Sequence, residues 1–559
     1  MEPSTKRQKT AHEVGLMRDS GFIGSASGVH FIQTVYGTAD GAAHHLVPGE
    51  DDALLPTRSI WLPDEVSDAP FSFVDLARWT APYFEHWHPC FPHLHAPSIL
   101  AAMESYPQID TYDAIILRSI MSISLADLRP GARQPAPRQL LFDTFDEALE
   151  SIQPAISRPP TLKSIQALLT VQTFLISMLR LNAASRVGGL VIRMAYQMGI
   201  HRCPARYSSF TAEEASMRRR IFHSMYCLDR IISHSLGLPL TIRDDDVDVC
   251  DFEHEEHGTS PAMDHRLKML MLLSRQARIR GKIMELRNKN VPHRDRSADA
   301  PTLIKIELTR WWNEVDDCLD QDNFSALQRT ILGVLRNECI ITLNRPLLAL
   351  SKSSASYMAG LQSCIAASKA IISALHSFGG PLVWPSFTWA VWMSCFIIIF
   401  AASEGQIATE VAVRLTERAG KVLGTLGLRG TVWPDACATA VEKLRQSLIN
   451  QSTPSRAFAT TLGFAIPQSP PGQEEAAQPA NGSQALDTGR LADINANPGQ
   501  EQIPADAQPD LTGGQTQPVI MDMPRDQMSF NTNEYDPFQG FDIPFWVGQD
   551  HYAAWSSTM

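Results

Sequence analysis

The stretch between Arg186 and Cys250 limits the possible folds most, because two apolar stripes at helical spacing follow one another there. Apolar residues that recur every three or four positions form one face of an α-helix, and a folded chain buries that face. The first stripe consists of Val187, Leu190, Val191, Met194, Ala195 and Met198, and the second of Met217, Ile221, Met225, Leu228 and Ile232. The stretch therefore predicts two consecutive amphipathic helices.

Boundary signals flank both stripes. Gly199 follows the first stripe, at the place where a glycine in left-handed conformation commonly ends a helix. Thr211 and Glu214 precede the second stripe with the spacing of a capping box, in which the hydroxyl and the carboxylate satisfy amides at a helix start. A Gly-Leu-Pro turn at residues 237–239 and an acidic run come after the second stripe. These signals set the expected ends of both helices.

Five charged residues lie beside the second stripe or at its border. They are Arg218, Arg219, Arg220, Asp229 and Arg230. Such side chains are rarely buried without a partner, so we expect them to form ion pairs that hold helices together. Asp229 lies about two to three turns beyond the arginine triplet, too far to pair with it within one helix. Phosphate or DNA contact by the triplet is the weaker alternative.

Helical patterning extends from Phe71 to about Asn450, and strand-like alternation is scarce. Pro159 and Pro160 precede Thr161, where a helix should begin. Further helices are expected to bury Ile165, Leu168, Leu169, Ile176 and Leu179; Leu267, Leu270, Met271 and Leu273; and Leu303, Ile306, Leu308, Trp311 and Trp312. The fold class that follows is all-α.

The most apolar run of the chain, Phe387 to Ala402, is about sixteen residues long and contains Ser and Thr. A bilayer crossing needs about 20 apolar residues, so the run predicts a buried helix, and we expect no membrane contact. Four tryptophans are expected to fill the core between the last helices: Trp384, Trp389, Trp392 and Trp433.

The nine cysteines are scattered, and their spacing fits neither a CxxC metal knuckle nor a compact disulfide framework. We therefore expect reduced thiols in a cytosolic or nuclear protein. The formal net charge of −12 excludes a nucleic-acid-binding protein that is basic over its whole length. Contact with DNA would need a local cationic patch, and none stands out.

The segment HWHPCFPHLH gathers possible metal ligands. They are His86, His88, Cys90, His93 and His95. Their spacing alone permits a zinc site. Pro89 and Pro92 stiffen the segment, however, and no carboxylate lies between the ligands. A packing role for the segment is favoured.

The acidic run DDDVD gives the chain its one serious enzymatic alternative. Asp244, Asp245 and Asp248 match the aspartate-rich pattern with which all-α terpene synthases bind magnesium diphosphate. The run follows a turn instead of lying on a long helix, and no second Asn/Ser/Glu metal motif appears downstream. A metal-dependent enzyme is therefore the alternative to a non-catalytic, regulatory protein.

The two ends of the chain differ from its middle. Residues 1–20 are polar and are predicted to be disordered; Lys6, Arg7 and Lys9 form a basic cluster that is either a nuclear import signal or part of a solvated tail. Residues 451–559 hold 13 acidic residues against 3 arginines and no lysine. Their Pro-, Gln- and Gly-rich composition predicts a disordered acidic tail.

Aromatic residues return near the C-terminus, interleaved with acidic ones. They are Tyr535, Phe538, Phe541, Phe545, Trp546, Tyr552 and Trp555. Acidic neighbours keep such aromatics in solution, a composition typical of amphipathic activation segments that dock weakly into a coactivator groove. We expect Phe541, Phe545 and Trp546 to make that contact. The alternative is that this end packs against the helical domain.

Three consecutive pieces, GLVIRMAYQMGIHR, RRRIFHSMYCLDRIIS and GLPLTIRDDDVDV, resemble the middle homology region of fungal zinc-cluster transcription factors, the xylanolytic-activator type of regulatory domain. FIGSASGVHFIQTVY and YFEHWHPCFPHLHAPSI upstream, and ITLNRPLLAL and CIAASKAII downstream, are similar to further family elements in the same order. The resemblance covers about residues 21–450. It implies a Gly-Ser-rich leading segment at 21–70 and an all-α regulatory domain at 71–450.

The resemblance also implies a nuclear regulator of RNA polymerase II transcription. Its helical domain would supply dimerisation, restraint of activity or metabolite sensing, and its tail would recruit coactivators. The positions that carry the likeness are expected to be structural. They are Arg193, Gly199, His201, Arg219, Asp229, Arg230, Gly237 and Pro239.

One family feature is missing from the sequence. Members usually begin with a binuclear zinc cluster held by six cysteines within about thirty residues, whereas this chain has no cysteine before Cys90. Three explanations are open: a cluster precedes Met1 in a longer chain, the protein acts through a DNA-bound zinc-cluster partner as a homo- or heterodimer, or another surface binds DNA. Zinc is expected only in the first case, and no cofactor is expected in this chain.

Overall fold

The fold is all-α, as the sequence predicts. The computed structural model describes residues 15–18, 21–24, 59–129, 135–252, 267–288, 299–321, 324–384 and 386–452. Strands within these ranges are short: β1 (Gly15–Arg18) pairs antiparallel with β2 (Gly21–Gly24), and β3 (Val66–Ser67) pairs parallel with β4 (Ala136–Pro137). The remaining regular elements of the described part are helical.

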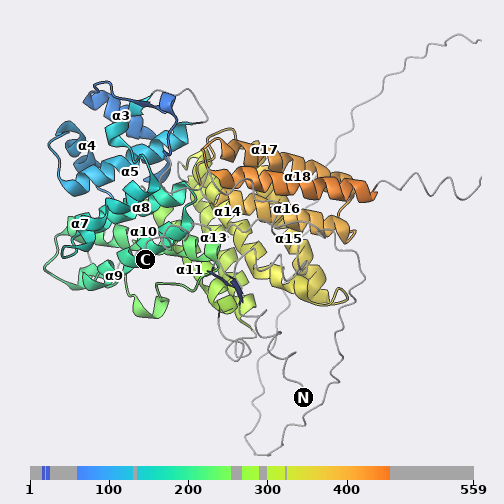
Figure 1. Ribbon diagram of the computed structural model, residues 1–559. Coiled ribbons are helices and arrows are strands. Elements are labelled where there is room, and N and C mark those ends of the chain that lie inside the picture. Colours follow the sequence, from blue (N-terminus) through green and yellow to red (C-terminus); the bar gives the residue numbers. More distant parts are fainter. Residues whose placement is uncertain are drawn as a thin grey trace, which may run out of the picture. The chain divides into compact units, whose positions relative to one another are not determined.

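A first set of helices contains the two that the opening stripes predict. Its members are η1 (Pro63–Glu65), α3 (Phe73–Pro82), η2 (Tyr83–Trp87), α4 (Ala96–Glu104), α5 (Thr111–Leu128), η3 (Arg138–Leu140), α6 (Phe145–Glu150), α7 (Gln153–Ile156), α8 (Leu162–Ser177), α9 (Leu181–Gln197), η4 (Pro204–Arg206) and α10 (Ala212–Leu236). Helix α8 packs against α5 and α9, and α9 packs against α10. Figure 1 draws this set in blue to green.

A second set follows a short helix, η5 (Asp244–Asp246). Its members are α11 (Lys268–Asn288), α13 (Ala300–Gln321), α14 (Ala326–Asn344), η8 (Arg345–Ala349), α15 (Ala355–Ser377), α16 (Phe387–Ser403), α17 (Thr409–Gly427) and α18 (Val432–Ser452). Helices α16, α17 and α18 pack on one another and lie side by side in Figure 1. Helix α11 packs against both α10 and α14, so it joins the two sets.

Most of the boundary signals act as expected. Helix α10 begins after Thr211, whose hydroxyl accepts a hydrogen bond from the Glu214 amide at 3.1 Å. Thr161 caps α8 in the same way. The Glu214 carboxylate does not complete the predicted capping box, because it pairs with Arg218 instead. Gly199, with φ +64°, follows the end of α9, and Gly237, with φ +69°, ends α10. This left-handed conformation suits glycine, which has no Cβ to clash with the carbonyl oxygen.

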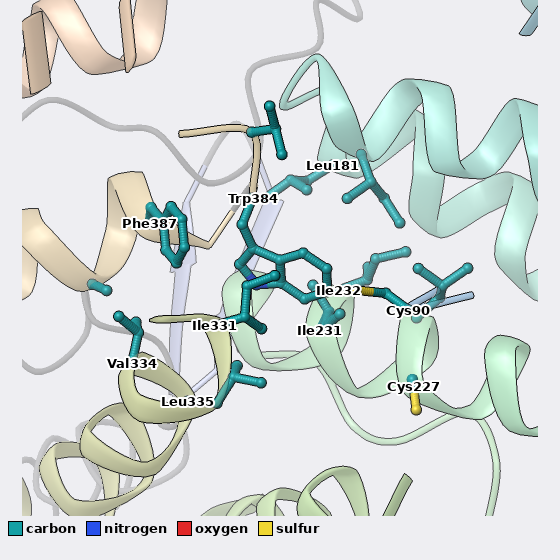
Figure 2. Packing of buried hydrophobic residues seen from close by; sticks show 14 of the residues in the cluster. Cys90, Leu181, Cys227, Ile231, Ile232, Ile331, Val334, Leu335, Trp384 and Phe387 are labelled. Atoms are coloured by element: carbon teal, nitrogen blue, oxygen red, sulfur yellow. The ribbon is translucent and has the colours of Figure 1, made fainter. Parts of the chain in front are cut away.

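Helix α16 confirms the buried helix expected from the apolar run: nearly all of its side chains are buried. Trp392 lies in that core, and Trp389 and Trp433 pack against it from half-buried positions. Trp384 is buried in the core as expected, but not between the last helices: it stacks on Trp87 of η2 and on Phe91, which follows η2, with ring centroids 6.2 and 5.6 Å away. Figure 2 shows Trp384 beside Ile231 and Ile331, so it fills the junction between the two sets.

The expected apolar stripe of α13 is partly wrong. Leu303 and Ile306 are exposed, while Leu308 and Trp311 are buried. The buried face of α13 consists of Ile304, Leu308, Trp311, Val315 and Cys318. These positions keep the regular spacing of three and four residues. The predicted stripe, by contrast, combined residues from two faces of the helix.

Helix α15 is the one helix in the described ranges that is long and apolar enough to cross a bilayer. Half of that apolar stretch is buried inside the protein. The buried side chains include Leu361, Cys364, Ile371 and Ile372, and the helix packs against α14, α16 and α17. Helix α15 therefore has the burial of a core helix.

Candidate functional site

The charged residues of α10 centre on Arg230, whose side chain is fully buried. Its Nη1 donates to Asp229 Oδ2 at 2.6 Å, and its Nη2 donates to Asp244 Oδ1 at 2.7 Å. The guanidinium also lies 4.1 Å from the centre of the Tyr226 ring, at cation–π distance. The Tyr226 hydroxyl donates to the same oxygen of Asp244 at 2.8 Å. Arg230 thus ties α10 to the acidic turn that follows it.

Asp229 is only 5% exposed. Burial raises the pKa of its carboxyl, and the attraction of Arg230 and hydrogen bonds from Thr241 and the Ile242 amide oppose that rise. A buried carboxylate with these partners stabilises the turn in one conformation. The expected ion pair between helices is confirmed only in part at this position: Arg230 pairs with Asp244 of the short helix η5, but its other partner, Asp229, lies on α10 itself.

The arginine triplet is held by structure as well. Arg218 pairs with Glu214 one turn earlier at 3.1 Å and donates to the Met198 carbonyl at the end of α9. Arg220 donates to the carbonyls of Pro92 and Leu94 in the His-Pro segment, at 2.7 Å each. These two arginines do bridge elements, but through carbonyl groups instead of carboxylates.

Arg219, the third arginine of the triplet, is half-buried. Its guanidinium lies 5.7 Å from the centre of the Phe252 ring. The charge of Arg219 opposes the rise that burial causes in the pKa of the Cys250 thiol.

The aspartates of the acidic run do not converge. Asp244 points to Arg230, while Asp245 is 90% exposed in its side chain and approaches Arg243 only to 3.9 Å. Asp248 turns to another loop, where it pairs with Arg206 at 3.0 Å and accepts the Cys203 amide at 2.9 Å. A magnesium diphosphate site needs several carboxylates around one ion. The divergent arrangement does not provide one.

The possible ligands of the His-Pro segment also have separate partners. Nε2 of His88 lies 3.1 Å from the Leu94 carbonyl, Nε2 of His93 lies 3.2 Å from the Thr170 hydroxyl, and Nδ1 of His95 lies 2.8 Å from the Ser98 hydroxyl. No group of three or more His, Cys, Asp or Glu in the described ranges is arranged to hold a metal ion. The segment packs under α10, to which Arg220 ties it.

With His93 replaced by glutamine, the protein should lose less stability when the pH falls. Burial, assisted by the nearby His88, lowers the pKa of His93 to about 3, whereas this histidine is protonated at about pH 6.5 in the unfolded chain. A depressed folded pKa gives stability that is present above the unfolded pKa and is lost as pH falls toward the folded one. The free energy of unfolding should thus fall less steeply below pH ~6.5 in H93Q, by about 1.4 kcal/mol per pH unit.

Denaturant titrations between pH 7 and pH 4 measure this slope. His95→Gln is the matched control, because His95 lies two positions away in the same segment and is exposed. Its slope should equal that of the unchanged protein. An unaltered slope in H93Q would show that His93 takes up its proton in the folded state as easily as in the unfolded chain.

A second buried ion pair, which no local sequence pattern predicts, lies between α11 and α14. Arg280 Nη2 donates to Glu338 Oε2 at 2.9 Å, and both side chains are at most 7% exposed. Burial raises the pKa of the Glu338 carboxyl, and Arg280 opposes the rise. Nearby, Nε2 of His234 on α10 lies 3.0 Å from the Thr342 hydroxyl on α14. Polar contacts therefore link α10, α11 and α14.

A small cavity lies at the same junction. Its lining includes Phe91, Arg230, Arg280 and Trp384. It has room for about one water molecule, whereas pockets for small metabolites enclose about 300 Å³ or more. The geometry of this cavity does not suit a metabolite.

A third buried network joins helix ends that are far apart in sequence. Arg429, between α17 and α18, pairs with Asp127 at the end of α5 and donates from Nε to the Ser177 carbonyl at 2.8 Å. Asp127 also accepts from Trp87 Nε1 at 2.9 Å. Arg129 donates to the carbonyl of Arg429 at 2.6 Å. The network connects the first set of helices to the last two helices.

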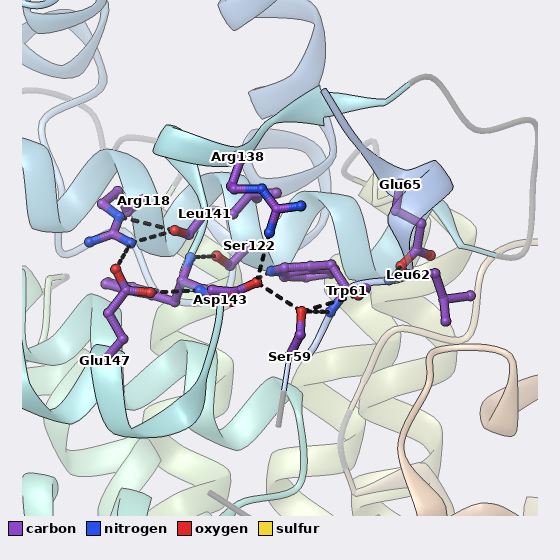
Figure 3. Close-up of polar contacts among 11 residues, drawn as sticks. Ser59, Trp61, Leu62, Glu65, Arg118, Ser122, Arg138, Leu141, Asp143 and Glu147 are labelled. Carbon is purple, nitrogen blue, oxygen red and sulfur yellow. Dashed lines mark hydrogen bonds and ion pairs between the residues drawn. The ribbon is translucent and has the colours of Figure 1, made fainter. Parts of the chain in front are cut away.

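Arg129 anchors this network to the N-terminal edge by pairing with Glu65, whose side chain is fully buried, at 3.0 Å. Gly430 has φ +86°, and a Cβ there would lie 1.8 Å from Arg129 Nη1, so only glycine fits this position. Figure 3 shows Glu65 at this edge, together with the contacts of Arg118 with Glu147 and the Leu141 carbonyl.

The eight positions that carry the family resemblance fall into two classes. Gly199, Gly237, Asp229, Arg230 and Arg219 lie at helix ends or in the contacts described above. The others contribute less: Arg193 and Pro239 are exposed, and His201 is half-buried with its ring 4.8 Å from that of Tyr196. The candidate activation residues Phe541, Phe545 and Trp546 lie outside the described residues, as do Lys6, Arg7 and Lys9.

Comparison with known proteins finds one matching family model and several similar proteins. Residues 82–337 match the sequence model of the fungal specific transcription factor domain. The chain is 26% identical to the probable transcription factor FUP6 of Fusarium proliferatum, over 68% of this chain and 69% of the relative. It is 25% identical to the transcriptional activator protein acu-15 of Neurospora crassa, over 53% of this chain and 33% of the relative.

A third relative is the fusaridione A cluster transcription factor fsdR of Fusarium heterosporum, 22% identical over 77% of this chain and 88% of the relative. The matched family and these relatives are transcription factors and not enzymes. Together with the divergence of Asp244, Asp245 and Asp248, this rules against the terpene synthase alternative.

Proposed function

We propose that the protein regulates RNA polymerase II transcription in the fungal nucleus, because residues 82–337 match the sequence model of the fungal specific transcription factor domain. The family match is the observation that carries the proposal. The contacts of α10 agree with it, because the buried Arg230 pairs with Asp229 and Asp244 inside the helical domain. The charged residues of α10 thus have a structural role in the helical domain.

In this proposal the helical domain, residues 71–450, is the regulatory part and needs no cofactor of its own. The acidic tail, residues 451–559, recruits coactivators through Phe541, Phe545 and Trp546. DNA is reached through a zinc cluster upstream of Met1 or through a DNA-bound zinc-cluster regulator with which the protein dimerises. The support for the tail is its composition, in which aromatic residues alternate with acids.

Fusing residues 520–559 to an unrelated DNA-binding domain should raise the output of a reporter gene severalfold. The aromatic side chains supply the apolar contact with a coactivator, and the acidic residues keep them in solution. Reporter output in fungal cells, normalised to the level of the fusion protein, is the measurement.

The matched control replaces Phe541, Phe545 and Trp546 by alanine and leaves every acid in place. It should lose most of the activation. A flat response from the unaltered fusion would remove the activation role of the tail. Equal output from both fusions would show that acidity alone acts.

A further inference from the structure

Two cysteines that are 47 positions apart meet in the loops that flank α10. Cys203 follows α9 and opens η4, and Cys250 follows the acidic run. Their sulfur atoms lie 3.3 Å apart, at hydrogen-bond distance, and both are thiols in this structure. We propose that Cys203 and Cys250 are a redox modification site, at which a hydroperoxide converts the two thiols into a reversible disulfide that fastens the acidic turn to the end of α9.

The two loops are held together by contacts that do not involve sulfur. The Cys203 amide donates to Asp248 Oδ1 at 2.9 Å, and the Asp248 amide donates to the His201 carbonyl at 3.3 Å. Arg206 pairs with the same aspartate at 3.0 Å. The sulfur atoms therefore need to move only about 1.3 Å closer to reach a disulfide bond length of about 2.05 Å.

The two thiols differ in access. Cys250 is half-buried, whereas Cys203 is only 2% exposed. A small oxidant thus reaches Cys250 first, and Cys203 acts as the resolving thiol. Burial and the hydrogen bond with Cys203 raise the pKa of Cys250 to about 11, and Arg219 opposes the rise. Because the thiolate is the nucleophile, the oxidation should be slow at neutral pH and faster as pH increases toward that value.

The chemistry balances with hydrogen peroxide as the oxidant. The Cys250 thiolate attacks one peroxide oxygen, the O–O bond breaks, and a sulfenic acid and hydroxide form, the hydroxide taking up the proton that Cys250 released. The sulfur of Cys203 then attacks the sulfenic sulfur of Cys250, the S–O bond breaks, and the hydroxyl group leaves as water with the proton of Cys203. Two thiols are oxidised to one disulfide while one peroxide is reduced to two waters.

The disulfide would close a loop that contains the whole of α10. Closing such a loop removes freedom from the unfolded chain and so stabilises the folded state. It would also fix the acidic turn in which Asp244 binds Arg230. The oxidised domain should accordingly melt at a higher temperature than the reduced one, by on the order of 5 °C.

The test treats the full chain with hydrogen peroxide at pH 8.5, blocks remaining thiols by alkylation and digests the protein with trypsin without reductant. Cleavage after arginine places Cys203 in peptide 203–206 and Cys250 in peptide 244–266. Mass spectrometry should find these two peptides joined, and prior treatment with dithiothreitol should separate them. Recovery of both peptides as separately alkylated thiols, or as sulfinic acids, overturns the proposal.

Melting curves provide a second readout. Cys203→Ser and Cys250→Ser should each abolish the rise in melting temperature on oxidation. Cys318→Ser is the matched control, a change of a buried thiol on α13, and it should keep the rise. A rise that persists in Cys250→Ser would assign the effect to other thiols and contradict the proposal. The joined peptide of the unaltered protein decides the question if a serine variant does not fold.

Discussion

Replacing Arg230 with alanine should lower the free energy of unfolding by about 4 kcal/mol. The change removes the cation from a fully buried site and leaves Asp229, at 5% exposure, without its charged partner. Removing one partner of a buried ion pair typically costs about 3–5 kcal/mol, because the remaining charge is desolvated and uncompensated. Denaturant unfolding at pH 8 measures the loss.

The pH dependence of this loss identifies its cause. Burial already raises the pKa of Asp229, and loss of Arg230 raises it further. A raised folded pKa gives stability that is present below the unfolded pKa and is lost as pH rises through the folded one. The loss of unfolding free energy that R230A causes should therefore be smaller at pH 5 than at pH 8.

Two controls separate charge from packing. Arg243→Ala changes an arginine of the same turn whose side chain is 71% exposed, and should leave stability unchanged. The double variant Asp229→Asn with Arg230→Met removes both charges and keeps most of the volume, so it should recover much of the loss. Unchanged unfolding of R230A would show that Asp229 is solvated and that Arg230 does not lock the turn.

Replacing Asp127 with alanine should also lower the free energy of unfolding by about 4 kcal/mol, because it leaves the guanidinium of Arg429 buried without its carboxylate. Trp87 loses its hydrogen-bond acceptor at the same time. Since Arg429 joins α17 and α18 to the first set of helices, the amides around residue 429 should exchange with solvent faster. Denaturant unfolding and hydrogen exchange measure the two effects.

Glu417→Ala is the matched control for D127A. Glu417 on α17 pairs with Arg445 on α18 at 3.2 Å, but its side chain is 51% exposed, and Arg445 keeps Glu442 as a partner. Solvent screens such a pair, so the change should cost about 0.5 kcal/mol or less. A loss in D127A no larger than that of the control would show that the Arg429 network contributes little.

Local signals in the sequence predicted the helical class and several helix ends. Thr211 and Gly199 act through neighbours within a few residues, so their roles can be read without knowledge of the fold. The stripe of α13 was only partly predicted, because an apolar residue such as Leu303 can lie on an exposed face. The buried helix α16 was predictable because it is apolar all round.

The long-range contacts could not be predicted. Asp127 and Arg429 are 302 positions apart, and Arg280 and Glu338 are 58 apart, so no spacing rule connects them. The meeting of Cys203 and Cys250 is hidden for the same reason. The rarity of buried charge predicted that the charges of α10 would have partners, but it did not identify them. The partner Asp244 of Arg230, for example, depends on the path of the chain after Gly237. Periodicity carries no information on that path.

Chromatin immunoprecipitation of the tagged full chain from the fungus that encodes it tests the regulatory function most directly, because it detects occupancy whether the protein contacts DNA itself or through a partner. We expect enrichment at discrete promoters whose transcripts change when the gene is deleted. A distribution indistinguishable from background, with the transcripts unchanged in the deletion strain, would contradict it.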